Sequence, residues 1–176
     1  MPLFGEMDSE ELLEIVNYKG EVIGSAPRSE IHGNPSLLHR VVHVLVFNPA
    51  GDLLLQKRSQ NKDVAPGKWD TSVGGHVGIG EDLLSSSMRE MHEELGVLGY
   101  KPEYLYSYVH SNQYETELVA TFRCLCSGEF AFNREEIDEI RFWSLGEIRQ
   151  AIGKNVLSDN FEHEFMTYLG HTGSVI

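Results

Sequence analysis

Residues 75–97 read GHVGIGEDLLSSSMREMHEELGV, and this stretch decides the fold. Its first six residues are rich in glycine, and the rest has the periodicity of a helix. A turn of about 100° per residue places four apolar side chains on one narrow stripe. These are Leu84, Met88, Met91 and Leu95. Gly96 then stands where a left-handed residue commonly ends a helix. The sequence therefore predicts a tight glycine turn followed by an amphipathic helix.

The opposite side of this helix is acidic. Glu90, Glu93 and Glu94 share an arc of roughly 100° on the helical wheel, and like charges at this spacing repel by a few tenths of a kcal/mol per pair. A helix that needs only a solvated face would more naturally alternate its charges. Hard oxygen ligands suit Mg²⁺ or Mn²⁺, which neutralise the repulsion and bridge to phosphate oxygens. We therefore expect this face to bind divalent metal ions.

The residues around the acidic face favour the same role. Arg89 is placed to hold a neighbouring carboxylate by a forked hydrogen bond and to keep it ionised. Glu81 stands at the expected start of the helix, where the helix dipole favours a carboxylate. Gly75 has no side chain, so its backbone can approach a ligand closely.

The whole stretch resembles the signature of the Nudix hydrolases, with every defining position filled. Those positions are Gly75, Glu81, Arg89, Glu90, Met91, Glu93, Glu94, Gly96 and Val97. The resemblance implies that the three helix glutamates and the carbonyl of Gly75 bind divalent metal ions. It also implies that Arg89 orients Glu90. One of the helix glutamates, or a distant carboxylate, would activate the attacking water, and we favour Glu90, then Glu94, then Glu117.

Composition limits the class of protein. The chain has 176 residues and a formal net charge of −13, with 41% hydrophobic and 23% charged residues. These values are typical of one soluble globular domain. Such an acidic protein is a poor partner for a nucleic-acid polymer, so we expect a small-molecule diphosphate substrate bridged by Mg²⁺ or Mn²⁺.

The sequence also predicts where the protein works. Residues 1–14 contain no signal-peptide pattern, and no apolar run is long enough to span a bilayer. Cys124 and Cys126 are the only cysteines, and two residues this close in a strand rarely form a disulfide. We therefore expect a cytoplasmic protein that does not contact membranes.

Strand-like and helix-like segments are mixed along the chain, as in an α+β fold. Strands are predicted at residues 12–16, 21–25, 41–47, 53–56, 69–73, 104–110, 117–126 and 139–143. Besides the central helix, a helix is predicted at residues 145–152, with Ser144 as its N-cap and Glu147 three residues on. A last helix is predicted to open at Ser158 or Asp159 and to run to residue 168, with Gly170 closing it. Together with the resemblance, this predicts a Nudix-fold α/β/α sandwich with a mixed central sheet. Residues 1–176 would form a single domain in which 1–35 are an accessory N-terminal hairpin, a possible homodimer contact.

A second set of residues resembles a particular branch of that fold. The run VFNPAGDLLLQKRS at 46–59, PGKWD at 66–70 and the Gly75-His76 pair are similar to isopentenyl-diphosphate isomerase, and the resemblance covers roughly residues 12–150. In that family three histidines and two glutamates cage a divalent metal. The matching positions here are His32, His39, His76, Glu115 and Glu117. Such a set suits Mn²⁺, Mg²⁺ or Zn²⁺.

One departure separates this chain from the isomerases. They move protons at carbon with a cysteine just before the Gly-His pair, and Gly74 occupies that position here. Losing the carbon acid should cost orders of magnitude in rate, whereas the helix carboxylates that the isomerases lose are intact. We therefore predict cleavage of a diphosphate linkage, X-P-P-Y, by water. The alternatives are an isomerase with another acid and a non-catalytic Nudix-fold sensor, which would not be expected to keep clustered like charges.

Basic residues that could bind the terminal phosphates lie in or beside the loop before residues 69–73. They are Arg58, Lys62 and Lys68. Their alternative role is that of ordinary solubilising charges. The sequence does not identify X and Y.

Overall fold

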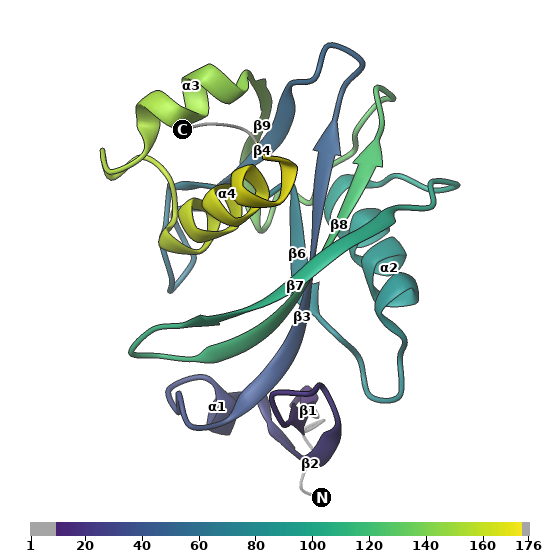
Figure 1. The fold of residues 1–176 in the computed structure, drawn as a ribbon, viewed down its shortest axis with the longest axis vertical. Coiled ribbons are helices and arrows are strands. Elements are labelled where there is room, and N and C mark those ends of the chain that lie inside the picture. Colours follow the sequence, from purple (N-terminus) through teal and green to yellow (C-terminus); the bar gives the residue numbers. More distant parts are fainter. Residues whose placement is uncertain (1–9, 174–176) are drawn as a thin grey trace, which may run out of the picture.

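The computed structural model describes residues 10–173, which are organised around one long strand, β3 (Leu38–Phe47). β3 pairs antiparallel with β6 (Val73–His76) on one side and parallel with β8 (Thr116–Leu125) on the other. β7 (Glu103–Ser111) extends the sheet antiparallel to β8. The central sheet is therefore mixed, as predicted (Figure 1).

A second group of strands follows the turn after β3. β4 (Leu53–Arg58) lies antiparallel to both β5 (Trp69–Asp70) and β9 (Ile137–Trp143). The single strand predicted at residues 69–73 is wrong, because the chain leaves β4 after Asp70 and joins β3 at Val73. This change of partner brings β6 to the centre of the molecule.

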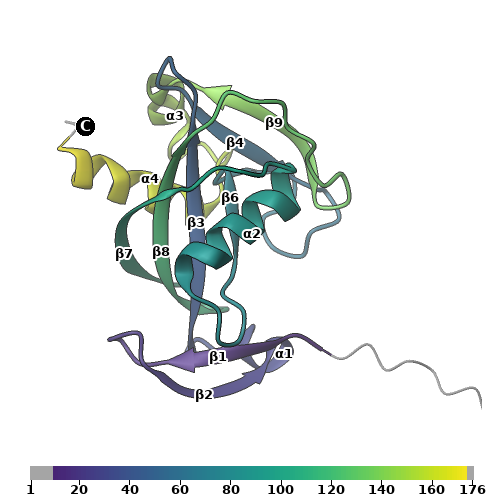
Figure 2. The ribbon, with the colours of Figure 1, turned by 90° about the vertical axis from the view of Figure 1, so that its right-hand side faces the viewer.

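Helices cover both faces of the sheet, which confirms the predicted α+β sandwich (Figure 2). α2 (Leu83–Leu95) covers one face, and α3 (Leu145–Ala151) and α4 (Asp159–Thr172) cover the other. Side chains of β3 alternate between the two resulting cores. Val42, Val44 and Val46 pack with α2, whereas Leu45 and Phe47 pack with α4.

The caps of the C-terminal helices are largely as predicted. Ser144 and Glu147 form a capping box at the start of α3, and Ser158 caps α4 by accepting a hydrogen bond from the Phe161 amide. The predicted end of α4 at Gly170 is wrong. The helix continues to Thr172 because Gly170 keeps a helical backbone, and the left-handed residue that ends it is Gly173.

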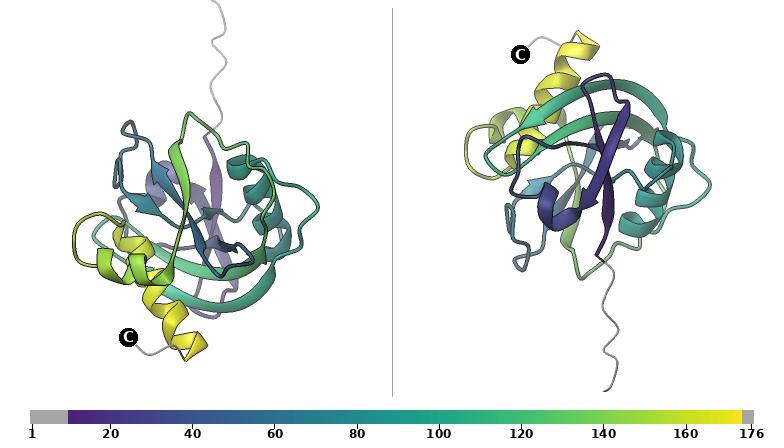
Figure 3. Two further views of the ribbon diagram at one scale, coloured as in Figure 1. Left: turned by 90° about the horizontal axis from the view of Figure 1, so that it is seen from above. Right: turned by 90° about the horizontal axis from the view of Figure 1, so that it is seen from below.

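The N-terminal region forms the predicted hairpin, although residues 1–9 of the predicted accessory region lie outside the described residues. β1 (Leu12–Val16) and β2 (Val22–Pro27) pair antiparallel and lead into one helical turn, α1 (Arg28–Ile31). Figure 3 shows that the hairpin lies across one end of the sheet. There Ile15 of β1 pairs with His39 of β3. This arrangement places the loop after α1 beside the central strands.

The buried face of α2 differs from the predicted apolar stripe. Met88 is 38% exposed, whereas Ser87 and Glu94 are buried together with Met91 and Leu95. Small serine side chains let the helix approach the sheet closely, so the face in contact is rotated toward Glu94. The carboxylate of Glu94 is therefore inside the protein and not on an open acidic face.

No helix within residues 10–173 is both long enough and apolar enough to cross a membrane.

Two glycines provide a test of this fold. Gly96 ends α2 with φ of +68°, and a Cβ there would lie 2.7 Å from the carbonyl oxygen of Ala131. Gly96→Ala should therefore lower the free energy of unfolding by about 1–2 kcal/mol. Gly170→Ala is the matched control, since a Cβ at this helical position meets nothing within 4 Å. It should raise stability by about 0.5–1 kcal/mol. Urea denaturation measures both, and equal effects would contradict the predicted contact.

Candidate metal and catalytic site

Arg89 is the centre of the polar contacts on α2. Its guanidinium donates two hydrogen bonds to Glu81, at 3.0 and 2.9 Å, and one each to Glu90 at 2.8 Å and Glu93 at 3.1 Å. A further bond of 3.0 Å reaches the carbonyl oxygen of His76. The hydrogen bonds from Arg89 are the main cause that lowers the pKa of Glu81 to about 2. Arg89 thus ties the start of α2, the acidic residues and β6 together.

Glu90 lies against the backbone of β6. A Cβ on Gly75 would lie only 2.1 Å from the Glu90 carboxyl carbon, so the absence of a side chain at this position makes room for the carboxylate. Burial raises the pKa of Glu90 to about 7, against the opposing effect of the hydrogen bond and charge of Arg89. A carboxyl group with this pKa can exchange a proton near neutral pH.

Glu94 lies deeper in the protein, beneath the same strand. One carboxylate oxygen accepts a hydrogen bond of 3.1 Å from the side chain of Gln56, and the other accepts one of 2.9 Å from the amide of Gly74. Burial raises the pKa of Glu94 to about 8. Gln56 was missed by the sequence analysis, and its only signal was a polar residue at the end of the apolar run at residues 53–55.

The three predicted carboxylate ligands on α2 have different surroundings and do not converge. The Glu93 side chain is 54% exposed, Glu90 is held by Arg89, and Glu94 faces Gln56. Among residues 10–173, the groups of side chains with ligand atoms within 4.8 Å of one another do not include this triad. A cation shared by Glu90 and Glu93 would have to compete with Arg89, which contacts both.

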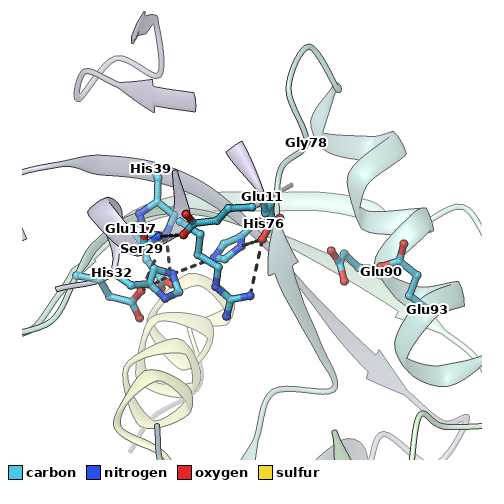
Figure 4. Close-up of polar contacts among 12 residues, drawn as sticks. Glu11, Ser29, His32, His39, His76, Gly78, Glu90, Glu93 and Glu117 are labelled. Carbon is cyan, nitrogen blue, oxygen red and sulfur yellow. Dashed lines mark hydrogen bonds and ion pairs between the residues drawn. The ribbon is translucent and has the colours of Figure 1, made fainter. Parts of the chain in front are cut away.

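Histidines and glutamates from distant parts of the chain do converge on the other face of β6. The ligand atoms of His32, His39 and His76 lie within 4.8 Å of one another, and so do those of His39, Glu115 and Glu117. We call these five residues the histidine cage. The Nε2 atom of His32 lies 3.3 Å from Nε2 of His76 (Figure 4). It lies 3.4 Å from a Glu115 oxygen. The structure thus brings together all five residues that the resemblance pointed to.

The electrostatics of the histidine cage fit a cation. His39 is fully buried, and its Nε2 atom has no hydrogen-bond partner among the described residues. Burial and then the neighbouring His76 and His32 lower the pKa of His39 to about 3. Burial, followed by the charge of Arg28, likewise lowers the pKa of His76 to about 3. Both imidazoles are therefore neutral at pH 7 and offer lone pairs, which is the form that binds metal ions.

The cage and the α2 carboxylates lie on opposite faces of β6. Successive residues of a strand point to opposite sides, so a side chain at Gly75 would meet Glu90, whereas one at Gly74 would meet His43. Figure 4 shows Glu90 and Glu93 on one side of β6 and His32 and His39 on the other. The two groups are connected through the backbone of His76, whose carbonyl binds Arg89 and whose ring belongs to the cage.

The predicted phosphate-binding residues are engaged elsewhere. Arg58 donates to Asp70 at 3.2 Å and to the carbonyl of Val64. Lys62 lies 3.4 Å from Glu136, and Lys68 donates to Asn155. Within the described part of the chain, no hydrogen bond or ion pair joins them to the α2 carboxylates or to the cage, so their role in binding substrate stays a prediction.

Comparison with known proteins places this chain in a family. The family model of the NUDIX domain matches residues 37–165. The Nudix hydrolase YfcD of Escherichia coli K12, described as uncharacterized, is 34% identical over 75% of this chain and 73% of its own length. PA4841 of Pseudomonas aeruginosa, described in the same way, is 33% identical over 75% of this chain and 78% of its own. The crystal structure of DR0079 from Deinococcus radiodurans matches 89% of this chain and 98% of its own, with a TM-score of 0.74 and 25% identity.

Burial of Glu94 predicts how stability depends on pH without metal. The pKa of Glu94 is about 8 in the folded protein against an ordinary value of 4.5, so the folded state binds the proton more tightly. Its contribution to stability is present below about pH 4.5 and is lost as the pH rises to about 8. With EDTA present, the unfolding free energy of the wild type should fall from about pH 5 to pH 8.5. It should fall less in Glu94→Gln, whose neutral amide resembles the protonated acid.

Urea denaturation at several pH values measures this difference. Glu103→Gln, at an exposed position, is the control and should follow the wild type. The same pH dependence in Glu94→Gln and the wild type would show that the buried carboxyl does not cause the effect.

Proposed function

This chain belongs to the Nudix hydrolase family, and on that premise we propose that it cleaves a diphosphate linkage, X-P-P-Y, in a nucleoside-diphosphate type of substrate. The observation that carries the proposal is the position of Glu90 and its contacts. Its carboxylate rests against Gly75, is bonded by Arg89, and has a pKa near 7. This combination suits a group that takes a proton from an attacking water.

Mg²⁺ or Mn²⁺ is the proposed cofactor. Glu90, Glu93, Glu94 and the carbonyl of Gly75 would hold it on the α2 side of β6. A divalent cation bound there supplies positive charge that offsets the charge on the bridging and leaving oxygens. Burial raises the pKa of both Glu90 and Glu94, and Glu94 accepts hydrogen bonds only from neutral donors. A cation would stabilise the ionised form of both groups, which supports this assignment.

Among the candidate bases, the hydrogen bonds favour Glu90. Both oxygens of Glu94 already accept bonds from Gln56 and Gly74, whereas only one oxygen of Glu90 accepts a bond among the described residues, from Arg89. Glu117 lies on the opposite face of β6, in the cage. Arg89 keeps Glu90 oriented through its bond of 2.8 Å.

We propose that the histidine cage is a second divalent-metal site. Support comes from the convergence of the five side chains, the two neutral imidazoles and the unpartnered Nε2 atom of His39. A metal there would lie on the α4 side of β6, next to the space that Gly74 leaves open. The substrate would then lie where groups from both faces of β6 can reach it.

The isomerase and the sensor remain the alternatives. The cage favours an isomerase-like branch, but Gly74 provides no carbon acid. Incubation with isopentenyl diphosphate should therefore give no allylic product, and its appearance would favour the isomerase. Release of phosphate or pyrophosphate from a panel of nucleotides, sugar nucleotides and dinucleotide cofactors with Mg²⁺ separates a hydrolase from a sensor.

We also propose a homodimer through the N-terminal hairpin and a cytoplasmic location. β2 is an edge strand with Val22 54% and Ile23 67% exposed, which supports pairing between two copies. The buried free thiols of Cys124 and Cys126 support a reducing compartment. Neither a nucleic-acid polymer nor a membrane is expected as a partner.

Mutation of the α2 carboxylates tests the hydrolase. Glu90→Gln should lower kcat/KM for the best substrate of the panel by about a hundredfold or more, since it removes the base. Glu94→Gln should also remove most activity, through weaker metal binding, without unfolding the domain. Exposed Glu103→Gln is the control and should keep wild-type turnover. Near-wild-type turnover of both α2 variants would show that α2 is not the catalytic platform.

Removal of a cage ligand tests the second metal site. In His39→Gln, binding of Mn²⁺ to the cage should weaken by at least about tenfold, since one of its imidazole ligands is lost. Isothermal titration calorimetry of metal-free protein measures this change. The matched control is His92→Gln, because His92 is exposed on α2. Identical titrations for the wild type and His39→Gln would exclude the cage as a metal site.

A further inference from the structure

A polar network that the proposed mechanism does not use lies beneath α4. Its centre is Glu164, which has no exposed surface. Its carboxylate accepts hydrogen bonds from Nδ1 of His43 at 3.0 Å, from the hydroxyl of Tyr106 at 2.7 Å and from the hydroxyl of Thr121 at 2.6 Å. The three donors are cross-strand neighbours on β3, β7 and β8. Glu164 is therefore anchored to the sheet through all of them.

Glu164 fixes the direction of the His43 ring. Because Nδ1 is bonded to Glu164, the opposite edge of the ring carries Nε2. A Cβ on Gly74 would lie 3.3 Å from Cδ2 and 3.6 Å from Nε2 of His43, so this edge faces the space that the glycine leaves open. No hydrogen bond to Nε2 is present among the described residues, and 9% of the His43 side chain remains exposed. This edge of the imidazole is available to a ligand.

Two further polar atoms on the same face are buried without partners. They are the hydroxyl of Tyr108 and Nε2 of His110. Tyr106, Tyr108 and His110 stand at every second position of β7, so the three side chains point to the same side of the sheet. Burial raises the pKa of Tyr108, which keeps its hydroxyl protonated as a donor. Buried polar atoms in native proteins nearly always have partners, and a ligand would supply them here.

This polar face is continuous with the histidine cage. His39 and His43 are four residues apart on β3 and therefore point the same way. Across the sheet, His110 pairs with Glu117, and Glu117 pairs with His39. A ligand held at the cage can thus extend over Gly74 toward the His43 ring.

The charge of His43 suits an anionic ligand. Burial opposes a charge on the ring, but the hydrogen bond and negative charge of Glu164, followed by Glu117 and Asp70, outweigh it and raise the pKa of His43. An imidazolium beside the cage is a suitable donor to a phosphoryl oxygen.

We propose that His43 is a further substrate-contacting residue, whose Nε2–H donates a hydrogen bond to a phosphoryl oxygen of the diphosphate held at the histidine cage. Glu164 is the positioning residue that holds the ring, and the hydroxyl of Tyr108 is a second donor to the same ligand. This inference rests on the proposed function, because it takes the diphosphate as the ligand.

Binding of methylenediphosphonate, a diphosphate analogue whose bridging carbon prevents hydrolysis, tests the proposal. Its dissociation constant with Mg²⁺ is measured by calorimetry for the wild type and for His43→Asn. The asparagine amide can still donate to Glu164 in place of Nδ1, but it lacks Nε2. We expect the dissociation constant to rise about tenfold to a hundredfold. His92→Asn, at an exposed position on α2, is the matched control and should bind like the wild type.

A wild-type measurement covers the case in which His43→Asn does not fold. In protein with ¹⁵N-labelled histidine, the Nε2 resonance of His43, assigned by through-bond correlation, should shift when the analogue is added. Two results would overturn the inference: unchanged binding of the analogue by folded His43→Asn, or an Nε2 resonance that does not move at saturation. If the wild type also cleaves a substrate of the panel, the proposed function stands and only this inference fails. A wild type that binds the analogue but cleaves no substrate contradicts the proposed function, while the His43 comparison still decides the contact. If the wild type neither binds nor cleaves, both proposals fail.

Discussion

The alternation of side chains along β6 is the constraint on which the rest of the site depends. This strand has four residues, Val73–His76, and is held in register with β3. Gly75 opens the face toward α2, where Glu90 fits against the backbone, and Gly74 opens the face toward α4, where His43 lies. A shift of one residue in register would exchange these faces, placing the space for Glu90 on the α4 side.

Arg89 offsets the negative charge of the carboxylates on the α2 side of β6. Helix carboxylates repel one another and lose solvation on burial, yet one guanidinium holds Glu81, Glu90 and Glu93 and also binds the β6 backbone. Burial raises the pKa of Glu94 more than that of Glu90, because Glu94 is beyond the reach of Arg89 and accepts hydrogen bonds only from neutral donors. The same burial that destabilises the ionised carboxyl groups prepares them to accept a cation or a proton. On the other face, burial keeps the cage imidazoles neutral and leads to the same preference for a metal ion.

Much of the fold could be predicted from local sequence. The glycine turn, the central helix ending at Gly96, the hairpin predicted at residues 12–16 and 21–25 and the caps of the last two helices follow from spacing and from the chemistry of turns. The errors have a common cause. Met88 is exposed because packing against the sheet, and not periodicity alone, selects which face of α2 is buried. The strand predicted at residues 69–73 is divided because the chain changes its pairing partner within it. The helix α4 continues beyond Gly170 because a glycine ends a helix only where its backbone leaves the helical conformation, and Gly170 does not.

The sequence by itself determined that an acidic helix with one arginine follows a glycine-rich turn. These features follow from residue type and short spacing, which local physical chemistry governs. The histidines and glutamates suited to a divalent metal were identified by the resemblance to isopentenyl-diphosphate isomerase. Only the tertiary structure decided that the α2 carboxylates and the cage occupy opposite faces of one short strand, that Glu94 is buried beside Gln56, and that Glu164 holds His43. The physical reason is that these contacts arise from the pairing of β3 with β6 and β8 and from the packing of α4. Such contacts join residues that are far apart in the chain, so they leave no periodic pattern in the sequence.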